Sequence, residues 1–379
     1  MKVVYFTEAL LPHVDGVSRT LARLFASLER QGVDFRIVSP FQPDDSISWS
    51  WRVRRVPFVR FPLYPDYHIS YPVPGLAAEL DAYAPDLVHV VSPTPMAIWA
   101  QRYARQRGLP VVSSFHTHFV SYLRYYGVPW LEELGWRYLR WFYNRCDAVY
   151  PPTHAIIGEL EEQGIRNLRL WSRGIDLARF SPRFRDLALR ERVGAGDGTP
   201  ILLLVSRLVK EKDLLDLVEV DRLLRERSTD FRLVFVGDGP LRGELEKRLP
   251  DAFFAGHQTG EALARWYASA DVFVFPSTTE TLGNVVLEAL ASGVPAVVVD
   301  RGGPQELITP GENGFVARAN DIVDITDRVE LLLRDAGPRR RMGERARESA
   351  ATRDWEAING RLLDSYTGVI AGRLSAGHR

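Results

Sequence analysis

Short runs of apolar, mostly β-branched residues alternate along the chain with longer stretches in which apolar positions recur every three or four residues. The runs in the first half predict strands at residues 3–6, 35–39, 87–91, 111–115, 148–150 and 168–171. The runs in the second half predict strands at residues 201–205, 232–236, 252–255, 272–275, 296–299 and 314–317. The intervening stretches predict amphipathic helices, for example at residues 17–30, 95–107 and 130–143. Continuous apolar strands that alternate with helices are typical of parallel sheets covered on both faces, so we predict an α/β fold with doubly wound sheets.

A change of composition separates the two series of strands. A Ser-Pro pair, a charge-rich stretch and a glycine-rich stretch follow one another between residues 181 and 198, which predicts a linker. We therefore predict two Rossmann-like domains, at residues 1–180 and 199–354, and a chain of 379 residues is long enough for both. The last predicted helix, from residue 355 to about 370, follows no strand of its own. We expect the segment 355–379 to pack on the first domain, with a simple terminal helix as the alternative.

The composition limits the classes of function. Hydrophobic residues make up 46% of the chain and charged residues 25%, which excludes a disordered protein. Lysine plus arginine and aspartate plus glutamate both total 48, so the basic excess that a dedicated nucleic-acid binder needs is absent. Cys146 is the single cysteine, which excludes an intrachain disulfide and fits a reducing cytoplasm. The first apolar run ends before Glu8 and no later run approaches the ~20 residues of a membrane span, so we expect any membrane contact to be peripheral.

Two common nucleotide-binding motifs are absent from the sequence. No G-x-G-x-x-G follows the first predicted strand, and no G-x-x-x-x-G-K-[ST] occurs anywhere. Two glycines, Gly237 and Gly239, follow the strand at 232–236, but a proline comes next and the third glycine is missing, so this element predicts a tight turn. Ligand-binding residues are therefore expected elsewhere at the carboxyl ends of the strands, where Rossmann-like domains bind their ligands.

The densest chemical signal follows the predicted strand at 272–275. A polar loop leads there into a helix that we expect to begin near Gly283 and to end at Ser292-Gly293. The first turn of a helix has N–H groups without helical partners and the positive end of the helix dipole, and a glycine lets an anion approach the backbone. Gly283, Asn284 and Val285 are therefore predicted to bind a phosphate group.

Two carboxylates flank this predicted phosphate site. Glu280 precedes the helix, and Glu288 lies eight residues further, in its second turn. Carboxylates accept hydrogen bonds from vicinal hydroxyls, and each such bond is worth roughly 1.5–3 kcal/mol. The arrangement suits a sugar on one side of a diphosphate and a ribose on the other. The alternative is structural, with Glu280 as a charge at the helix N-terminus and Glu288 as a surface residue.

Two cations follow the predicted strand at 201–205. Arg207 comes directly after it and Lys212 opens the next helix, and two cations at a strand's carboxyl end can neutralise a diphosphate as it leaves. The chain has four lysines against 44 arginines, so two lysines separated by one residue stand out. We expect Lys212 to bind phosphate, and Lys210 and Glu211 to be ordinary surface charges. For Arg207 the alternative is a structural ion pair.

These residues resemble the retaining GT-B glycosyltransferases of family 4, the group 1 transferases, over nearly the whole chain. The most specific part is the E-x7-E motif of Glu280 and Glu288, in a Glu-Thr-Leu-Gly and Glu-Ala-Leu-Ala-Ser-Gly-Val-Pro context. The element from Ser206 to Lys212 is similar to that family's diphosphate-binding pair, and a Gly-Gly-Pro-Gln-Glu element at 302–306 is similarly placed without an assigned role. The resemblance implies the GT-B fold, in which two Rossmann-like domains face each other across a cleft and the last helix crosses back to the first domain.

For the second domain, the resemblance implies a nucleoside diphosphate sugar as donor. Glu280 would hold the 3- and 4-hydroxyls of the sugar, and Glu288 would hold the ribose. Arg207, Lys212 and the amides of residues 283–285 would hold the diphosphate. The acceptor hydroxyl would attack on the leaving-group face with retention of anomeric configuration, and the diphosphate would take the proton. No cofactor and no metal are implied, in agreement with the absence of an Asp-x-Asp sequence.

For the first domain, the resemblance implies two further elements. Asp15 and Gly16, in the turn after the first strand, match the family's glycine loop, whose backbone lies against the donor phosphate and sugar. His116 matches the histidine that the family places beside the donor sugar, where an imidazole can bond a sugar hydroxyl and stabilise developing charge. His118 is the alternative for this role. A metal site at His116 and His118 would need a third ligand, which nothing nearby in the sequence supplies.

The stretch from residue 101 to residue 145 is basic and aromatic. It has seven arginines against two glutamates and many tyrosines and tryptophans, which suits an anionic membrane or a lipid acceptor with an anionic headgroup. The alternative is that the aromatic residues of segment 120–143 pack against the sheet. This stretch and the elements at 61–67 and 172–176 resemble the branch of α-mannosyl and sulfoquinovosyl transferases that build glycolipids. That branch often has Arg where this chain has His68, so we do not assume a sulfonate-bearing donor.

Together these features predict a retaining, metal-independent hexosyltransferase. Its donor would be GDP-mannose or a UDP-hexose, its acceptor a lipid or a saccharide, and its place the cytoplasm, with peripheral contact at the inner face of the cell membrane. Two alternatives remain: a GT-B nucleotide-sugar 2-epimerase, and a nucleotide-sugar-binding protein without catalysis.

Overall fold

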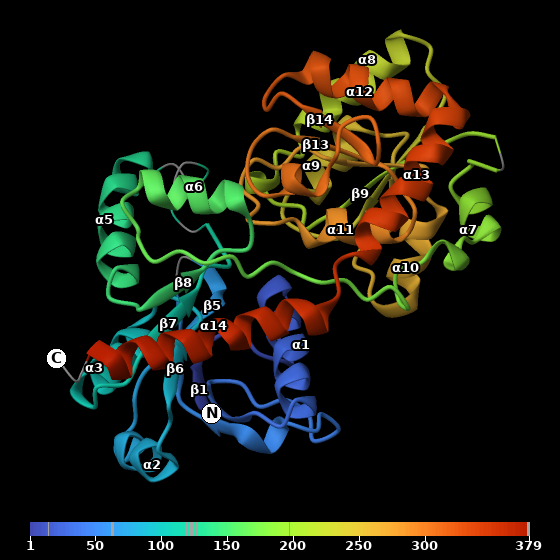
Figure 1. The fold of residues 1–379 in the computed structure, drawn as a ribbon. Coiled ribbons are helices and arrows are strands. Elements are labelled where there is room, and N and C mark those ends of the chain that lie inside the picture. Colours follow the sequence, from blue (N-terminus) through green and yellow to red (C-terminus); the bar gives the residue numbers. More distant parts are fainter. Residues whose placement is uncertain are drawn as a thin grey trace. The chain divides into compact units, whose positions relative to one another are not determined.

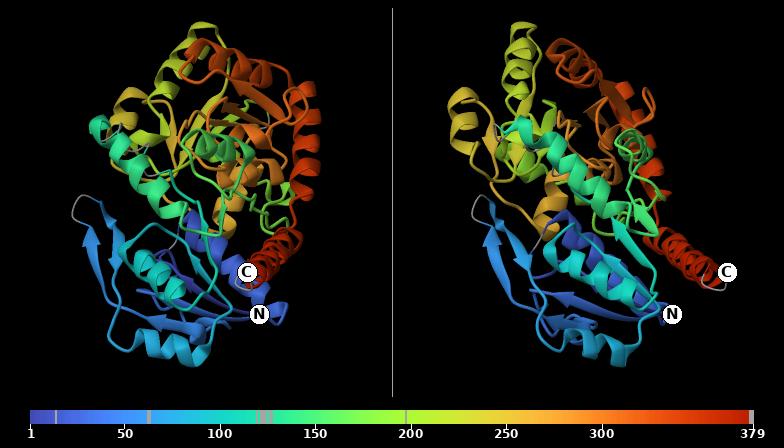
Figure 2. Two further views of the ribbon diagram at one scale, coloured as in Figure 1. Left: turned by 60° about the vertical axis from the view of Figure 1, so that its left-hand side comes forward. Right: turned by 90° about the vertical axis from the view of Figure 1, so that its left-hand side faces the viewer.

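The computed structural model describes residues 1–376 except 14, 62–63, 119, 121–124, 126–127 and 197. The chain forms two compact units (Figure 1). The first comprises Met1–Val120, Val128–Arg173 and Trp355–Arg379, and the second comprises Ser121–Gly127 and Gly174–Asp354. Each unit contains one six-stranded parallel sheet with helices packed on it, as Figure 2 shows from two further directions. The predicted α/β fold with two Rossmann-like domains is confirmed.

The sheet of the first unit has the strand order β3-β2-β1-β6-β7-β8. Its strands are β1 Lys2–Phe6, β2 Asp34–Ser39, β3 Val53–Arg55, β6 Leu87–Val90, β7 Val111–Ser114 and β8 Ala148–Tyr150. Its helices are α1 Gly16–Arg30, α2 Leu76–Tyr83, α3 Pro95–Gln106, α5 Glu132–Tyr143, α6 His154–Glu162 and α14 Trp355–Ala376. Short 3-10 turns, η1 Ser50–Arg52 and η2 Pro129–Leu131, and a separate hairpin of β4 Phe58–Phe61 and β5 Tyr64–Ser70 complete the unit.

The sheet of the second unit has the order β11-β10-β9-β12-β13-β14. Its strands are β9 Ile201–Val205, β10 Arg232–Val236, β11 Phe253–Phe254, β12 Val272–Phe275, β13 Ala296–Val299 and β14 Gly314–Ala317. Its helices are α7 Leu187–Arg192, α8 Asp216–Glu226, α9 Arg242–Arg248, α10 Gly260–Ser269, α11 Asn284–Ala291, α12 Ile322–Arg334 and α13 Ala336–Ala351. The 3-10 turns are η3 Pro182–Phe184, η4 Lys210–Lys212 and η5 Pro304–Leu307.

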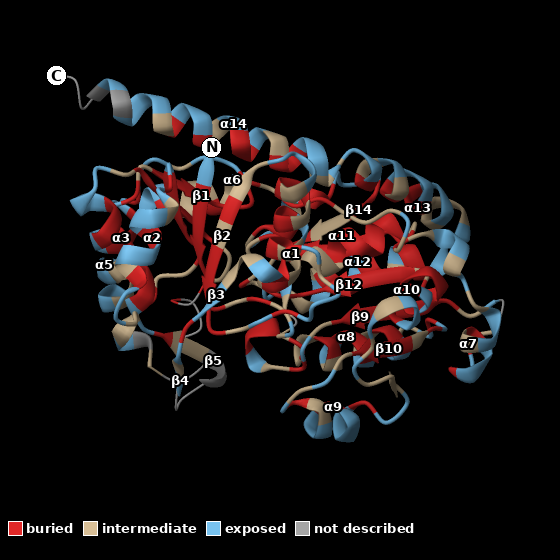
Figure 3. Ribbon diagram, turned by 90° about the horizontal axis from the view of Figure 1, so that it is seen from below, coloured by how far each residue is buried: buried red, intermediate tan, exposed pale blue. Residues whose placement is uncertain are grey.

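Both sheets are buried on their two faces, because helices cover each side. All residues of β6, β7, β9 and β12 are buried, which explains their continuous apolar runs. Figure 3 colours most of β1 and β12 as buried. Right-handed connections run outward from the centre of the first sheet in both directions, so α1 and α3 lie on its opposite faces.

The strand order places a topological switch point at the centre of each sheet. In the second unit, β9 pairs on one side with β10 and on the other with β12, which follows much later in the chain. In the first unit, β1 pairs in the same way with β2 and β6. Loops that leave neighbouring strands in opposite directions make a crevice at the carboxyl ends of such strands, and ligands of doubly wound folds bind there. The loops after β9 and β12 are therefore expected to carry ligand-binding residues.

The last helix, α14, belongs to the first unit. Its buried residues join the core of that unit, where Ile358 and Leu362 lie in one cluster with Leu21 and Phe25 of α1. Tyr366 adds a polar contact: its hydroxyl lies 2.5 Å from Nδ1 of the buried His89 on β6. Burial lowers the pKa of His89 to about 3, so the imidazole is neutral. The helix therefore completes the core of the first unit although it follows the second unit in the chain.

The structure differs from the predicted elements at three places. Residues 168–171 form no strand: Leu168 makes an isolated bridge to Val149, and the following backbone runs beside β8 with two hydrogen bonds. The strand predicted at 252–255 is only two residues long. The stretch 181–198, which we expected to be a linker, forms η3 and α7 of the second unit. Its anchor is Arg190, which is 1% exposed and donates to Asp271 Oδ2 at 2.6 Å, a long-range contact that local composition does not reveal.

Candidate active site

Lys212 and Glu280, which were predicted to hold the diphosphate and the sugar, are in contact at the switch point of the second unit. Lys212 ends η4 after β9, and Glu280 lies in the loop after β12. Lys212 Nζ is 2.5 Å from Glu280 Oε1. The Lys212 side chain is 9% exposed and the Glu280 side chain 24%, so the lysine is more deeply buried than its carboxylate partner. Two residues separated by 68 positions thus form one charged pair at the carboxyl edge of the sheet.

Hydrogen bonds that involve neighbouring side chains join the two loops that carry this pair. The Glu211 carbonyl accepts bonds from the hydroxyls of Ser277, at 3.4 Å, and Thr279, at 2.8 Å. Asp213 accepts bonds at 2.9 Å from the amide and the hydroxyl of Thr278. Bonds between their chain neighbours therefore hold the backbone of Lys212 and the loop before Glu280 in place.

Glu211 corrects one expectation. We expected an ordinary surface charge, but the residue is completely buried. Its Oε1 lies 3.9 Å from Nη2 of Arg207, whose side chain is 54% exposed. Lys210 is exposed, as expected. The η4 turn has only three residues, so it has no repeating apolar pattern that could indicate which charged residue is buried.

A glycine turn after β13 supports Glu280 and was assigned no role from the sequence. The Gly303 amide donates to the Glu280 carbonyl at 2.8 Å. A Cβ atom on Gly302 would lie 2.5 Å from that same carbonyl oxygen, and one on Gly303 would lie 2.0 Å from the Thr281 carbonyl oxygen. Only glycine fits this close backbone contact. The Gly302-Gly303 pair in the sequence is the signal that could have indicated it.

Helix α11 begins and ends where the sequence predicts. Gly283 is its N-cap with φ of 84°, Asn284 and Val285 are its first residues, and Ser292 is its C-cap. A Cβ atom at Gly283 would lie 2.9 Å from Cγ of Pro304, in addition to the strain of the positive φ. The amides of this first turn lie at the carboxyl edge of the sheet, directly after the loop of Glu280.

Glu288 is a buried residue of α11, which is the opposite of the surface alternative. It is 7% exposed, and its Oε2 accepts a hydrogen bond of 2.9 Å from the Tyr267 hydroxyl of α10. A carboxylate that is buried needs hydrogen-bond donors around it. Tyr267, which the sequence did not indicate, holds the Glu288 side chain in a defined orientation.

The turn after β10 packs against the chain that carries Arg207. A Cβ atom at Gly237 would lie 1.8 Å from the Ser206 carbonyl oxygen, and one at Gly239 would lie 2.5 Å from the Leu208 carbonyl oxygen. Leu208 in turn donates its amide to the Asp238 carbonyl at 2.9 Å. The predicted tight turn is therefore a backbone support for the Arg207 segment.

In the first unit, Asp15 and Gly16 begin helix α1. The Asp15 carboxylate accepts a 2.7 Å bond from the Ser18 amide, and the Ser18 hydroxyl accepts a 2.8 Å bond from the Asp15 amide, a capping box. Asp15 also lies 3.7 Å from Nε2 of His13. Asp15 thus satisfies the helix N-terminus with its side chain, while Gly16 is exposed.

The two candidate histidines after β7 have different surroundings. His118 is 7% exposed, and its Nε2 lies 2.6 Å from Oε1 of Glu159 in α6. This imidazole therefore forms a structural pair with a carboxylate. His116 is half-buried, and its Nδ1 lies 2.8 Å from Nη2 of the buried Arg173. Desolvation, then the nearby Arg173 charge, lower the pKa of His116 well below 6.5. The two histidines thus differ in their partners: His118 contacts a carboxylate, and His116 contacts a buried guanidinium.

The aromatic helix α5 packs one face on the sheet and exposes the other. Trp136, Leu139, Phe142 and Tyr143 are buried, which fits the packing alternative. The opposite side exposes Trp130 of the η2 turn and Leu134, Tyr138 and Trp141 of α5, with exposed fractions of 76%, 52%, 37% and 41%. We call these four residues the α5 surface.

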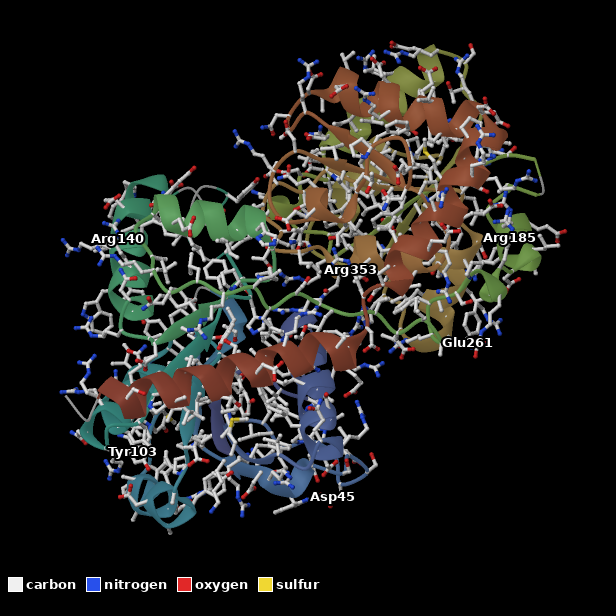
Figure 4. The ribbon with its side chains drawn as sticks, viewed as in Figure 1. Asp45, Tyr103, Arg140, Arg185, Glu261 and Arg353 are labelled. Carbon is white, nitrogen blue, oxygen red and sulfur yellow. The ribbon has the colours of Figure 1, made fainter. Side chains whose placement is uncertain are left out.

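Arginines surround the α5 surface. The Arg145 guanidinium stacks 4.0 Å from the Trp141 ring, Arg137 is exposed, and Arg140, labelled in Figure 4, lies on the same helix. The sequence pattern could not separate the two faces of α5, because aromatic residues occupy both. Tyr122 and Tyr126 of the same stretch lie outside the described residues. Tyr125 is grouped with the second unit, where its hydroxyl bonds Asp213 at 2.9 Å.

A cavity of about 390 Å³ in the first unit, lined by residues such as Gln101, Asn144 and Asp147, contains none of the predicted site residues. No three His, Cys, Asp or Glu side chains among the described residues come together as metal ligands would. None of the described helices is both long enough and apolar enough to cross a membrane.

Solved structures with the same fold are glycosyltransferases and related sugar enzymes. Sucrose-phosphate synthase from Thermosynechococcus elongatus superposes with a TM-score of 0.79 at 22% identity, over 98% of this chain and 99% of that one. Anabaena Alr3699/HepE in complex with UDP superposes with a TM-score of 0.76 at 18% identity, over 97% and 100% of the two chains. The fold is that of the GT-B glycosyltransferases.

Sequence relatives define the family. Residues 14–179 match the description "Glycosyltransferase Family 4", and residues 187–349 match "Glycosyl transferases group 1". GDP-mannose-dependent alpha-mannosyltransferases of Corynebacterium glutamicum and Mycolicibacterium smegmatis are 34% and 35% identical, over 98% of this chain and 90% and 99% of theirs. Sulfoquinovosyl transferase SQD2 of Arabidopsis thaliana is 34% identical over 78% of this chain and 59% of its own. The chain belongs to the group 1, family 4 glycosyltransferases, and it is a glycosyltransferase that uses a nucleotide sugar.

Proposed function

We propose that the protein is a retaining, metal-independent hexosyltransferase, with GDP-mannose as its first candidate donor and a UDP-hexose as the second. The observation that carries this proposal is the Lys212–Glu280 pair at the switch point of the second unit. A cation and a carboxylate in contact at this position offer one group for a phosphate and one for sugar hydroxyls. The names of the mannosyltransferase relatives support GDP-mannose over other donors.

Donor binding would exchange the partners of this pair. Lys212 and Glu280 neutralise each other, with 2.5 Å between Nζ and Oε1. A diphosphate at the first turn of α11 would take over Lys212, and the sugar hydroxyls would take over Glu280. Each new bond is charge-assisted, so the exchange retains electrostatic stabilisation while it places the anomeric carbon beside the leaving group. Arg207, which is half-exposed beside η4, would complete the neutralisation of the diphosphate.

Glu288 would hold the ribose of the donor. Its carboxylate is buried and oriented by Tyr267, so one of its oxygens is occupied by the tyrosine hydroxyl. A ribose diol can donate two hydrogen bonds to a carboxylate. The helix α11 would thus contact the donor at both ends of the diphosphate, through the amides after Gly283 and through Glu288.

We further propose that the acceptor is a lipid or a saccharide at the cytoplasmic face of the membrane, and that the α5 surface rests on this membrane. Amphipathic helices bind interfaces with an apolar aromatic face, and arginines around that face favour anionic lipids. The exposed Trp130 and Trp141 and the stacked Arg145 have this composition. The name of one relative, alpha-monoglucosyldiacylglycerol synthase of Streptococcus pneumoniae, agrees with a lipid acceptor.

Replacing Trp130 and Trp141 together by serine is expected to reduce binding to anionic vesicles by at least about tenfold, because two indole rings leave the interface. The measurement is co-sedimentation with vesicles of phosphatidylglycerol and phosphatidylcholine, at low and high salt. The matched control is Trp51→Ser, since Trp51 is 60% exposed in the same unit but outside the α5 surface. Equal loss in the control, or unchanged binding in the double variant, would show that the α5 surface is not the membrane contact.

The experiment that tests the proposed reaction has two stages. Calorimetry against UDP, GDP and ADP identifies the base, and labelled sugars of the binding nucleotide are then offered with lipid vesicles or soluble saccharides, with and without EDTA. We expect tight binding of one nucleotide, transfer with retained anomeric configuration, and no effect of EDTA. Release or epimerisation of the sugar without any acceptor would favour the 2-epimerase. Binding without turnover would favour a non-catalytic protein, and no binding at all would refute the donor site.

A further inference from the structure

Arg173 holds His116 at one particular ring nitrogen. The distance from Arg173 Nη2 to His116 Nδ1 is 2.8 Å. A guanidinium group only donates hydrogen bonds, so Nδ1 is the acceptor. A neutral imidazole with an accepting Nδ1 carries its proton on Nε2. The contact therefore defines the tautomer of His116, and it leaves Nε2 as the nitrogen that donates.

Arg173 itself is fixed by groups other than His116. Its Nη1 donates to the carbonyls of Trp171 at 2.6 Å and Ser172 at 3.0 Å, and its guanidinium stacks 4.5 Å from the Trp171 ring. The residue is 4% exposed, and within the described part of the chain it forms no salt bridge with a carboxylate. Burial lowers the pKa of Arg173 to about 9, which still leaves it charged at neutral pH. His116 thus faces a fixed positive charge.

The surroundings of His116 disfavour its protonation. Burial has the largest effect on its pKa, followed by the charge of Arg173 and a smaller effect of His89. His89 is neutral, since burial lowers its pKa to about 3. The His116 ring also packs edge-to-face on Trp171, with 5.7 Å between centroids. A protonated His116 would be repelled by the Arg173 charge beside it, so His116 stays neutral across the physiological pH range.

We propose that Arg173 is the positioning residue of His116, keeping the imidazole neutral with its proton on Nε2 so that His116 donates a hydrogen bond to a substrate oxygen. This inference rests on the proposed function, and on the family resemblance, which implies that His116 lies beside the donor sugar. The positive charge behind the ring polarises the Nε2–H bond and strengthens it as a donor. In this arrangement His116 is not a general base, because its Nδ1 is occupied and its Nε2 is protonated.

The first test uses the unmodified protein without substrate. Nitrogen-detected NMR of histidine-labelled protein, with His116 assigned by comparison with His116→Gln, reports which ring nitrogen carries the proton. We expect a protonated Nε2, an accepting Nδ1 and no titration between pH 5.5 and 8. A proton on Nδ1, or a titration near pH 6.5, would overturn the proposal without any Arg173 variant. This result does not depend on catalysis. If the proposed function were wrong, His116 would still have a protonated Nε2 and an accepting Nδ1, but no sugar would be transferred from any donor.

The second test removes the guanidinium. In Arg173→Met, the pKa of His116 should move up toward the ordinary value of about 6.5, and kcat at pH 8 should fall by at least about tenfold. Acidification below this raised pKa then protonates His116, and an imidazolium has a hydrogen on both nitrogens, so part of the loss should be recovered at the acidic end of the pH profile. Arg173→Lys keeps the charge and should stay close to the wild type in tautomer and pH profile. Nucleotide affinity and melting temperature serve as controls for folding. A loss of kcat in Arg173→Met that is the same at every pH, with an unchanged His116 titration, would mean that Arg173 is only structural.

Discussion

Replacing Lys212 by methionine is expected to lower kcat for sugar transfer by roughly 100- to 1,000-fold, or about 2.7–4 kcal/mol of transition-state stabilisation. The Lys212 side chain is only 9% exposed, so little water screens its charge. The leaving diphosphate gains negative charge as the glycosidic bond breaks, and methionine keeps the length of lysine without the charge. The measurement is the initial rate at saturating donor, together with the melting temperature to show that the variant is folded.

Lys210 offers a matched control for this prediction. It lies two residues earlier on the same η4 turn and is exposed to solvent, where a single charge contributes little. Lys210→Met should therefore keep kcat within about twofold of the wild type. Equal losses in both variants would indicate a general effect of charge near the switch point, and full activity of Lys212→Met would remove Lys212 from the site.

Replacing Glu288 by glutamine is expected to lower kcat/KM by roughly 10- to 150-fold, which corresponds to the 1.5–3 kcal/mol of a charge-assisted hydrogen bond. Glutamine has the same shape and can still contact Tyr267, so the fold should be unchanged. Complete truncation in Glu288→Ala should abolish transfer, as should His116→Ala. Calorimetry with the nucleoside diphosphate alone should show weaker binding, because the lost contact is to the ribose.

Deoxyribose nucleotides make this assignment specific. The wild type should bind the 2′,3′-dideoxy nucleotide more weakly than the ribose form, whereas Glu288→Gln should bind both with similar affinity. Tyr267→Phe is the control, since it removes only the hydroxyl that orients the carboxylate and should have a smaller effect on kcat/KM. If Glu288→Gln still prefers the ribose form as strongly as the wild type does, Glu288 does not hold the ribose.

Local sequence patterns predicted a helix or strand correctly wherever residues close in the chain determine its position. The bounds of α11 follow from Gly283 at one end and Ser292-Gly293 at the other, because caps and the left-handed glycine are local features. Buried strands such as β9 and β12 follow from continuous apolar runs. The prediction of a strand at 168–171 was wrong because an apolar run cannot show whether its backbone finds a full partner strand, and here only Leu168 forms a bridge.

Charged residues were harder to place than apolar ones. Glu211, Lys210 and Lys212 are adjacent on one short turn, yet the first is completely buried, the second exposed and the third nearly buried. A 3-10 turn of three residues has no repeating face from which burial could be inferred. Likewise, nothing around His118 in the sequence indicates its contact with the carboxylate of Glu159, which is 41 residues away.

The sequence by itself determined the class of fold, the two series of strands and the E-x7-E spacing that puts Glu280 before α11 and Glu288 within it. These features depend on residues that are close in the chain. The tertiary structure alone decided that Lys212 meets Glu280 and that Arg173 meets His116, pairs separated by 68 and 57 residues. It also decided which side of α5 is exposed. The physical reason is that strand order and register bring distant side chains together, and both depend on the packing of the whole unit.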